Sequence, residues 1–213
     1  MDNITRRERE KQVREGEIIA AAEKIFCKNG FDDASMDEIA AEAQFTKRTL
    51  YQYFANKEDL YFAVALKGFK MLFNYLQEAS VNEQTGYMKI YYSCVGYYKF
   101  YKDFPEILRL MDYIGHVKKK SKEDGERRKE LVQFNNEIFK WVAKWIEEGK
   151  DDGSICNDLD AAKTSFSIVF MMTGFFSQMA ANGETFMEHF TLEPENFIFS
   201  SMDLLFRSIK DNK

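Results

Sequence analysis

Three helix-start signals follow one another closely in the N-terminal third of the chain, at Ser35, Thr46 and Asn56. Ser35 is followed three residues later by Glu38, which is a capping box in which each side chain satisfies a backbone N–H. Thr46 and Asn56 are residue types that cap two further helices. A longer helical pattern, at about Glu8–Asn29, precedes them. A long helix followed by two short ones across a tight turn is the layout of a helix-turn-helix.

The rest of the chain continues the helical pattern. Only two of its 213 residues are proline, so long helices can run uninterrupted. The apolar spacing is helical nearly throughout, and no stretch shows strand-like alternation. We therefore predict an all-α fold of about nine helices. After the first three, helices are expected at about 57–79, 84–102, 105–116, 122–149, 160–182 and 194–210.

The composition is that of an ordinary soluble globular protein, with 45% hydrophobic and 31% charged residues. No window approaches the roughly 18 consecutive apolar residues of a membrane span. The N-terminal segment lacks the apolar centre of a signal peptide. We therefore expect a cytoplasmic protein without membrane association.

The net charge of -5 argues against a protein that coats nucleic acid, but it permits a local cationic surface. Exposed charges are screened beyond about 8 Å at physiological salt, so each surface acts locally. The extreme N-terminus supplies one such candidate, diluted by two glutamates, and the alternative is a solvated helix start. Its cations are Arg6, Arg7, Arg9, Lys11 and Arg14.

The stretch TKRTLYQYFANKEDL (46–60) supplies a second candidate surface. Leu50 and Phe54 are four residues apart, so they share one side of a helix and are expected to pack on the first two helices. Lys47 and Arg48 lie in the first turn, which comes closest to the bases when a helix-turn-helix enters the major groove. Arginine can grip guanine O6 and N7 with two hydrogen bonds. The alternative is that the aromatic residues of this stretch are core residues.

Residues 35–60, SMDEIAAEAQFTKRTLYQYFANKEDL, resemble the DNA-binding helix-turn-helix of the TetR family of transcriptional regulators. Phe26 and Gly30 at the end of the first helix match the family as well. So do the face formed by Ile39, Ala40 and Ala43 and the block at 50–60. The resemblance covers about the first 60 residues of the chain.

The resemblance implies specific DNA contacts. Base edges would be reached by Lys47, Arg48 and Tyr51. Phosphates would be held by Ser35, Thr46, Gln52, Tyr53 and Lys57. Gln44 departs from the family, which usually has glycine in this turn, and a positive φ there would cost on the order of 1–2 kcal/mol.

The last two predicted helices carry more apolar surface than one buried stripe requires. Residues 166–176 are apolar nearly all round, so that helix must be covered on two sides. Because a helix-turn-helix usually binds a two-fold operator as a dimer, we expect a homodimer that packs these helices against their copies. The alternative is a monomer with a thick core. The expected interface residues are Phe166, Phe170, Phe175, Phe199, Met202, Leu205 and Phe206.

The middle of the chain is rich in aromatic residues and methionine. Aromatic rings and methionine side chains, together with a few hydroxyl groups, are suited to line a binding site for a small apolar ligand. For any single residue the alternative is a well-filled core. The expected pocket residues are Tyr91, Cys94, Tyr98, Tyr101, Leu108, Met111, Phe139, Trp145 and Phe170.

We find no set of residues for catalysis, and we expect neither a metal nor a cofactor. The two histidines have no partner at ligand spacing, and the three cysteines lie far apart. The sequence thus predicts a DNA-binding domain at 1–56 and a ligand-binding and dimerisation domain at 57–213. The expected function is a repressor that binds a palindromic operator as a dimer and is released by a small apolar or aromatic effector. The alternative is an apolar-ligand carrier or sensor that retains the fold without binding an operator.

Overall fold

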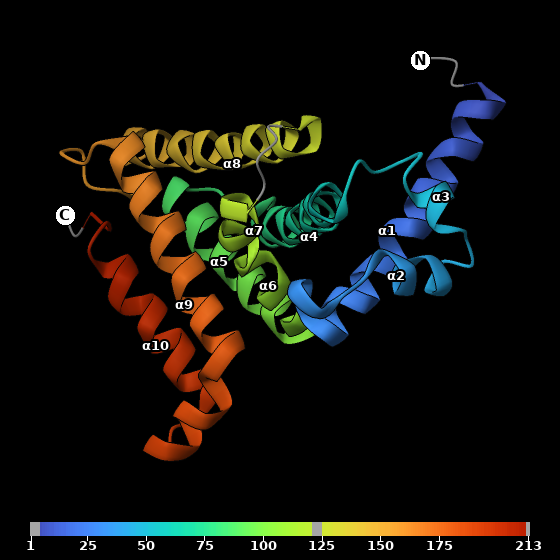
Figure 1. Cartoon of the computed structure of the whole chain (residues 1–213). Coiled ribbons are helices and arrows are strands. Elements are labelled where there is room, and N and C mark those ends of the chain that lie inside the picture. The colour runs from blue at the N-terminus through green and yellow to red at the C-terminus, as the bar shows by residue number, and fades with distance from the viewer. Residues whose placement is uncertain (1–4, 121–124, 212–213) are drawn as a thin grey trace. The chain divides into compact units, whose positions relative to one another are not determined.

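The computed structural model describes residues 5–120 and 125–211 and is helical, as predicted (Figure 1). Within these residues the only strand-like pairing is an isolated bridge between Ile155 and Lys210. The helices are α1 (Arg6–Asp33), α2 (Met36–Glu42), α3 (Lys47–Leu50), α4 (Lys57–Ser80), α5 (Gly86–Asp103), α6 (Pro105–Asp112), α7 (Ile114–Lys120), α8 (Glu126–Asp151), α9 (Ala161–Phe190) and α10 (Pro194–Arg207).

The chain forms two compact units. The first contains the described residues up to Phe69 together with Leu110–Leu131, and the second contains Lys70–Arg109 and the described residues from Val132 onward. The first unit therefore holds every described residue of the predicted DNA-binding domain at 1–56. It also includes the first half of α4, helix α7 and the first turn of α8.

The three helix-start signals of the N-terminal unit are confirmed. Ser35 Oγ accepts a hydrogen bond from the backbone N–H of Glu38, and the Ser35 N–H donates to the Glu38 carboxylate at 2.9 Å. Thr46 Oγ1 accepts from the N–H of Thr49 at 3.1 Å, which starts α3. Asn56 Oδ1 accepts from the N–H of the residue three positions later at 2.8 Å, which starts α4. Each cap satisfies backbone donors that a helix start leaves unpaired.

Several helix ends differ from the predicted ones. Helix α1 continues past Gly30, which takes φ 76° and kinks the helix instead of ending it. The helix predicted at 105–116 is divided into α6 and α7. Helix α9 runs through Gly183 and ends where Thr191 adopts φ 54°. A glycine inside a helix costs only about 1 kcal/mol, which the packing of α9 offsets.

The core of the first unit joins α1, α2, α3 and α4. Ile18, Ile39 and Leu50 are fully buried, as the predicted apolar faces require. An aromatic cluster continues this core, in which the Tyr61 ring lies 5.1 Å from that of Phe26 in an edge-to-face arrangement. The Tyr61 hydroxyl donates to the backbone oxygen of Leu110, so this buried polar group is satisfied.

The core of the second unit is formed by aromatic and aliphatic residues of α5, α8, α9 and α10. Tyr97 stacks on Phe176 with ring centroids 4.6 Å apart, which fixes α5 against α9. Close backbone contact also occurs, because a Cβ atom at Gly86 would lie 2.2 Å from the backbone nitrogen of Gly149. The start of α5 thus packs directly on the end of α8.

The turn between α2 and α3 carries backbone strain that one substitution can remove. Gln44 is exposed and has φ 57°, a left-handed conformation that glycine adopts without steric cost. Relief of this strain stabilises the folded chain, but the greater conformational freedom of glycine in the unfolded chain partly offsets the gain. Gln44→Gly should therefore raise the free energy of unfolding by only about 0.5–1 kcal/mol. The midpoint of urea unfolding measures this change. Ala43→Gly, at a right-handed position next to it, should lower the midpoint, and a lower midpoint for Gln44→Gly would contradict the strain.

Candidate nucleic-acid interface

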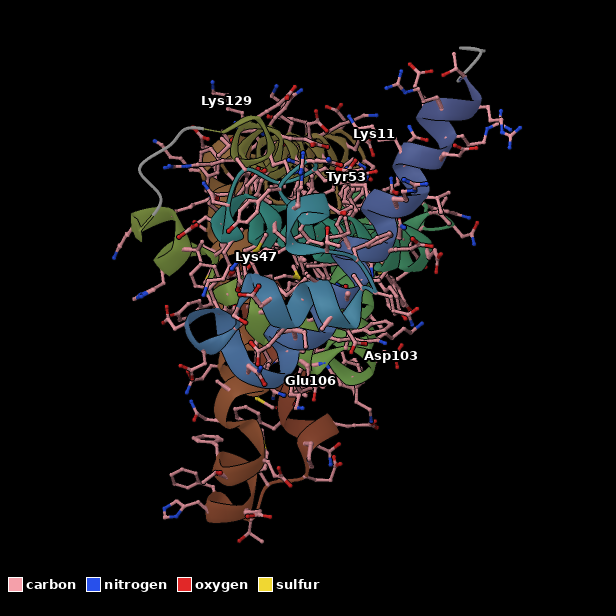
Figure 2. The ribbon with its side chains drawn as sticks, turned by 45° about the vertical axis from the view of Figure 1, so that its right-hand side comes forward. Lys11, Lys47, Tyr53, Asp103, Glu106 and Lys129 are labelled. Carbon is pink, nitrogen blue, oxygen red and sulfur yellow. The ribbon has the colours of Figure 1, made fainter. Side chains whose placement is uncertain are left out.

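Helix α3 and the turn after it separate an apolar side from a polar one. Leu50 is 0% exposed and Phe54 is 1% exposed, and both pack into the core of the first unit. Lys47 and Arg48 are exposed, and the Tyr51 ring is 48% exposed although it is a large aromatic side chain. Figure 2 labels Lys47 and Tyr53, which lie at the two ends of this segment. The predicted base-contacting residues are therefore all available at the surface of one short segment.

The two cations of α3 differ in their surroundings. The Lys47 ammonium donates to the Asp37 carboxylate at 2.7 Å, and this hydrogen bond is the main cause that raises the pKa of Lys47. The Arg48 guanidinium forms no ion pair within residues 5–120 and 125–211. Arg48 therefore presents all of its donors to solvent, whereas Lys47 has to share its charge with a carboxylate of α2.

Lys57, predicted to contact phosphate, caps the end of α1 in this structure. Its ammonium donates to the backbone oxygens of Phe31 at 2.6 Å, Asp32 at 3.1 Å and Ala34 at 2.7 Å. It also lies 4.5 Å from the centre of the Phe31 ring. An ammonium has three donors, so the contacts use all of them. A cation at this place also suits the negative end of the helix dipole.

The hydroxyl groups predicted to hold phosphates have local partners as well. Ser35 Oγ lies 2.8 Å from the Glu38 carboxylate, to which it donates. Thr46 Oγ1 lies 2.9 Å from Thr49 Oγ1. Gln52 is exposed and Tyr53 is half-buried. These residues lie in one unit and on consecutive elements, α2 to the start of α4.

Arg127, at the start of α8, was not predicted to be part of this region. Its guanidinium pairs with Glu15 of α1 at 2.7 Å and with Asp59 of α4 at 2.8 Å. It also donates to the backbone oxygen of Tyr53 at 3.1 Å and lies over the Phe54 ring at 4.4 Å. One half-buried arginine thus connects α1, the segment after α3, and the first turn of α4.

The predicted pocket residues lie in both units. Met111 belongs to the first unit, whereas the others belong to the second. Cys94, Leu108 and Trp145 are buried, and Phe170 is 82% exposed. Burial raises the pKa of the Cys94 thiol to about 12, which removes its nucleophilic character at neutral pH. Tyr101 and Phe139 are half-buried.

The hydroxyl groups of two predicted pocket tyrosines attach α10 to α5. Tyr98 donates to the Glu195 carboxylate at 2.7 Å, and Tyr91 donates to Asp203 at 3.1 Å. Burial, together with the Asp203 carboxylate, raises the pKa of Tyr91 to about 12. These hydroxyls therefore have a structural partner within the second unit.

The predicted interface residues have different degrees of exposure. Phe166 is 53% exposed and Phe170 more so, whereas Phe175, Phe199 and Leu205 are half-buried. Met202 and Phe206 are buried within the single chain. Further large apolar side chains on α9 and α10 are exposed, namely Met171, Phe186, Phe190 and Leu204.

No group of histidine, cysteine and carboxylate side chains that could hold a metal occurs among the described residues. In the same part of the chain no helix is long and apolar enough to cross a membrane.

Comparison with known proteins assigns the N-terminal region. Residues 18–64 match the family model of the bacterial regulatory proteins, tetR family. A stretch of 51 residues is 45% identical to the HTH-type transcriptional activator FasR of Mycolicibacterium smegmatis. This match covers 24% of the present chain and 23% of FasR, so the chain matches about a quarter of that relative's length.

Similarity of fold extends over nearly the whole chain. The regulator FadR from Bacillus subtilis in complex with stearoyl-CoA has a TM-score of 0.69 at 17% identity, with 89% of this chain and 96% of that chain covered. AibR in complex with isovaleryl coenzyme A and operator DNA has a TM-score of 0.68 at 19% identity, with coverage of 91% and 98%. At these identities the likeness concerns the fold.

The contacts of Arg127 predict a loss of stability when the side chain is removed. Arg127→Ala leaves two half-buried carboxylates without their cation, so we expect about 2 kcal/mol lower stability of the first unit. Amide hydrogen exchange at Tyr53 and Phe54 should accelerate in the variant. Lys129→Ala, at an exposed position two residues further along α8, is the matched control. Equal exchange rates in both variants would show that Arg127 does not hold this segment.

Proposed function

We propose that the whole chain is a ligand-responsive transcriptional regulator, because residues 18–64 match the family model of the bacterial regulatory proteins, tetR family. It binds a palindromic DNA operator as a homodimer, and a small apolar effector changes that binding. The observation that carries the proposal is the geometry of α3. Leu50 and Phe54 are buried, and this burial turns Lys47, Arg48 and Tyr51 outward on one short segment.

Arg48 is the main base-reading residue in this proposal. It is exposed and has no acidic partner in the described part of the chain, so both arms of its guanidinium can reach guanine O6 and N7. Lys47 lies one residue earlier and reads a neighbouring base after it exchanges its contact with Asp37 for one with DNA. Tyr51, one turn after Lys47, contacts a base with the exposed part of its ring.

Phosphate contacts come from the residues around this segment. Ser35 and Thr46 each stand at the N-terminus of a helix, where the positive end of the helix dipole favours an anion. Gln52 and Tyr53 follow α3 and hold the backbone of the same groove. Lys57 contributes through its positive charge at the start of α4, because its donors are occupied by backbone oxygens of α1.

A homodimer would cover the exposed aromatic side chains of the second unit. Phe166 and Phe170, four residues apart on one face of α9, and Leu204 on α10 are each more than half exposed, and larger exposed apolar patches mark sites of protein–protein contact. A homodimer of this kind carries two copies of α3, which is the number that a palindromic operator requires. Met202 and Phe206 are buried within each chain, so in this proposal they belong to the core beneath the interface and do not contact the partner directly.

The proposed effector is an apolar compound bound in the second unit, and an acyl-CoA is the class to test first. The support is twofold: the core of this unit is rich in aromatic rings, and FadR and AibR, which share the fold, are named with acyl-CoA ligands. Helix α4 belongs to both units by its sequence range, so it is the covalent route by which a ligand-dependent change would reach α3.

Arg48→Ala tests the DNA-binding proposal. A palindromic duplex is first selected from a random pool by the wild-type protein, and sedimentation should show two chains on it. The variant should lose about 1–3 kcal/mol of binding free energy, and it should lose preference at one base pair of each half-site. Titration of single-base operator variants measures this preference. If neither protein selects a duplex, the carrier or sensor function becomes the better description.

Addition of an acyl-CoA tests the effector. Stearoyl-CoA at 100 times its dissociation constant should stabilise the protein by about 2.7 kcal/mol, seen as a higher melting temperature. It should also change the affinity for the selected duplex. If the effector changes the affinity for DNA by some factor, DNA must change the affinity for the effector by the same factor. The sign of the change distinguishes release from promotion of DNA binding. Coenzyme A without an acyl chain is the control, and equal effects of both compounds would argue against an apolar effector.

A further inference from the structure

The first three turns of α1 extend beyond the part of the helix that packs into the first unit. The first buried residue of α1 is Ile18, although the helix begins at Arg6 with a capping box formed by Thr5 and Glu8 (Figure 1). Residues 6–17, which are all exposed except the half-buried Glu15, therefore form a helical arm, which is about 18 Å long at 1.5 Å per residue. Figure 2 labels Lys11, which lies on this arm.

One stripe of α1 changes its character where the arm begins. Residues spaced by three and four positions share a face of a helix. From Ile18 onward, this face is apolar and buried, and it includes Ala21 and Ala22. Before Ile18, the same face carries Arg7, Lys11 and Arg14, which are all exposed. The side of α1 that packs against the helix-turn-helix thus becomes cationic on the arm.

The acidic residues beside this stripe are largely engaged within the protein. Glu8 caps the helix by accepting from the N–H of Thr5 at 2.8 Å. Glu10 pairs with Arg6 at 2.9 Å, and Glu15 pairs with Arg127 at 2.7 Å. Glu17 is exposed and lies to one side of the stripe.

The three stripe cations themselves have no such partners. Within residues 5–120 and 125–211, Arg7, Lys11 and Arg14 form no ion pair. Helix geometry places them on one line along the arm, about 5–6 Å apart. Three unpaired cations at this spacing match a row of phosphates, which follow one another closely along a DNA strand.

We propose that this arm is a second DNA-binding element, in which Arg7, Lys11 and Arg14 contact phosphates that flank the sequence read by α3. The proposal rests on the proposed function and adds a contact region to it. The arm belongs to the same unit as α3, so both elements bind as one body. A contact of this kind adds affinity and salt dependence but no base preference, because phosphates carry no sequence information.

The test uses two duplexes and two matched triple variants. One duplex is the palindrome selected by the wild-type protein, and the other carries about ten additional base pairs on each side. At 3.4 Å per base pair the arm can span about five base pairs, so the longer duplex offers it enough flanking DNA. The arm variant is Arg7→Gln, Lys11→Gln and Arg14→Gln together. The control variant, Lys28→Gln, Lys140→Gln and Lys163→Gln, changes the net charge equally at other exposed positions.

On the longer duplex we expect the arm variant to bind at least tenfold more weakly at physiological salt. The slope of log K against log salt should decrease by about 3, or about 0.9 for each lost phosphate contact. On the short duplex, the arm variant should match the wild type. The control variant should match the wild type on both duplexes, and all proteins should melt at the same temperature because glutamine is a good helix former.

Two results would overturn the proposal while leaving the proposed function intact. One is an unchanged salt slope of the arm variant on the longer duplex. The other is an equal loss for the arm and control variants, which would reduce the effect to net charge. Failure of the wild-type protein to select any duplex would instead reject the proposed function, and the arm with it.

Discussion

The burial of Leu50 and Phe54 is the contact on which the candidate interface depends. Helix α3 has only four residues, and a helix of that length is not stable in water by itself. It persists because Leu50 is fully buried in the core of the first unit and because Thr46 accepts a hydrogen bond from a backbone N–H in its first turn. The direction of Arg48 is therefore set by packing two residues away, not by any contact of its own.

Much of the N-terminal unit could be predicted from the sequence, because its signals are local. Capping boxes and apolar spacing involve residues only a few positions apart, whereas the positive φ at Gln44 was anticipated from the family resemblance, in which glycine is usual in this turn. Arg127 and Lys57 could not be placed in this way. Their partners lie 25 or more residues away in sequence for most contacts, and a run of mixed charges gives no sign of which cation turns inward. The helical boundaries at Gly30 and Gly183 failed for a related reason, since tertiary packing decides whether a glycine ends a helix.

The second unit shows how far composition alone can lead. Aromatic residues and hydroxyl groups suggested a pocket, yet the hydroxyls of Tyr91 and Tyr98 bind carboxylates of α10. A periodic sequence pattern identifies the apolar side chains of a helix, but it does not show whether the same chain or a partner chain packs against them. For that reason, residues expected at an interface between chains divide into exposed ones such as Phe170 and buried ones such as Phe206. The exposed members of this set lie on α9, whereas its members on α10 are half-buried or buried.

The contact between Gly86 and Gly149 has a consequence for how this protein can change over time. Any side chain at position 86 would collide with the backbone of α8, and any side chain at position 149 would collide with Ile155. The collision at position 86 cannot be relieved by a rotamer change, since it involves backbone atoms of α8, whereas the collision at position 149 involves side-chain atoms of Ile155. Any substitution at position 86 therefore requires α5 and α8 to move apart, so we expect this residue to stay glycine in descendants of this chain.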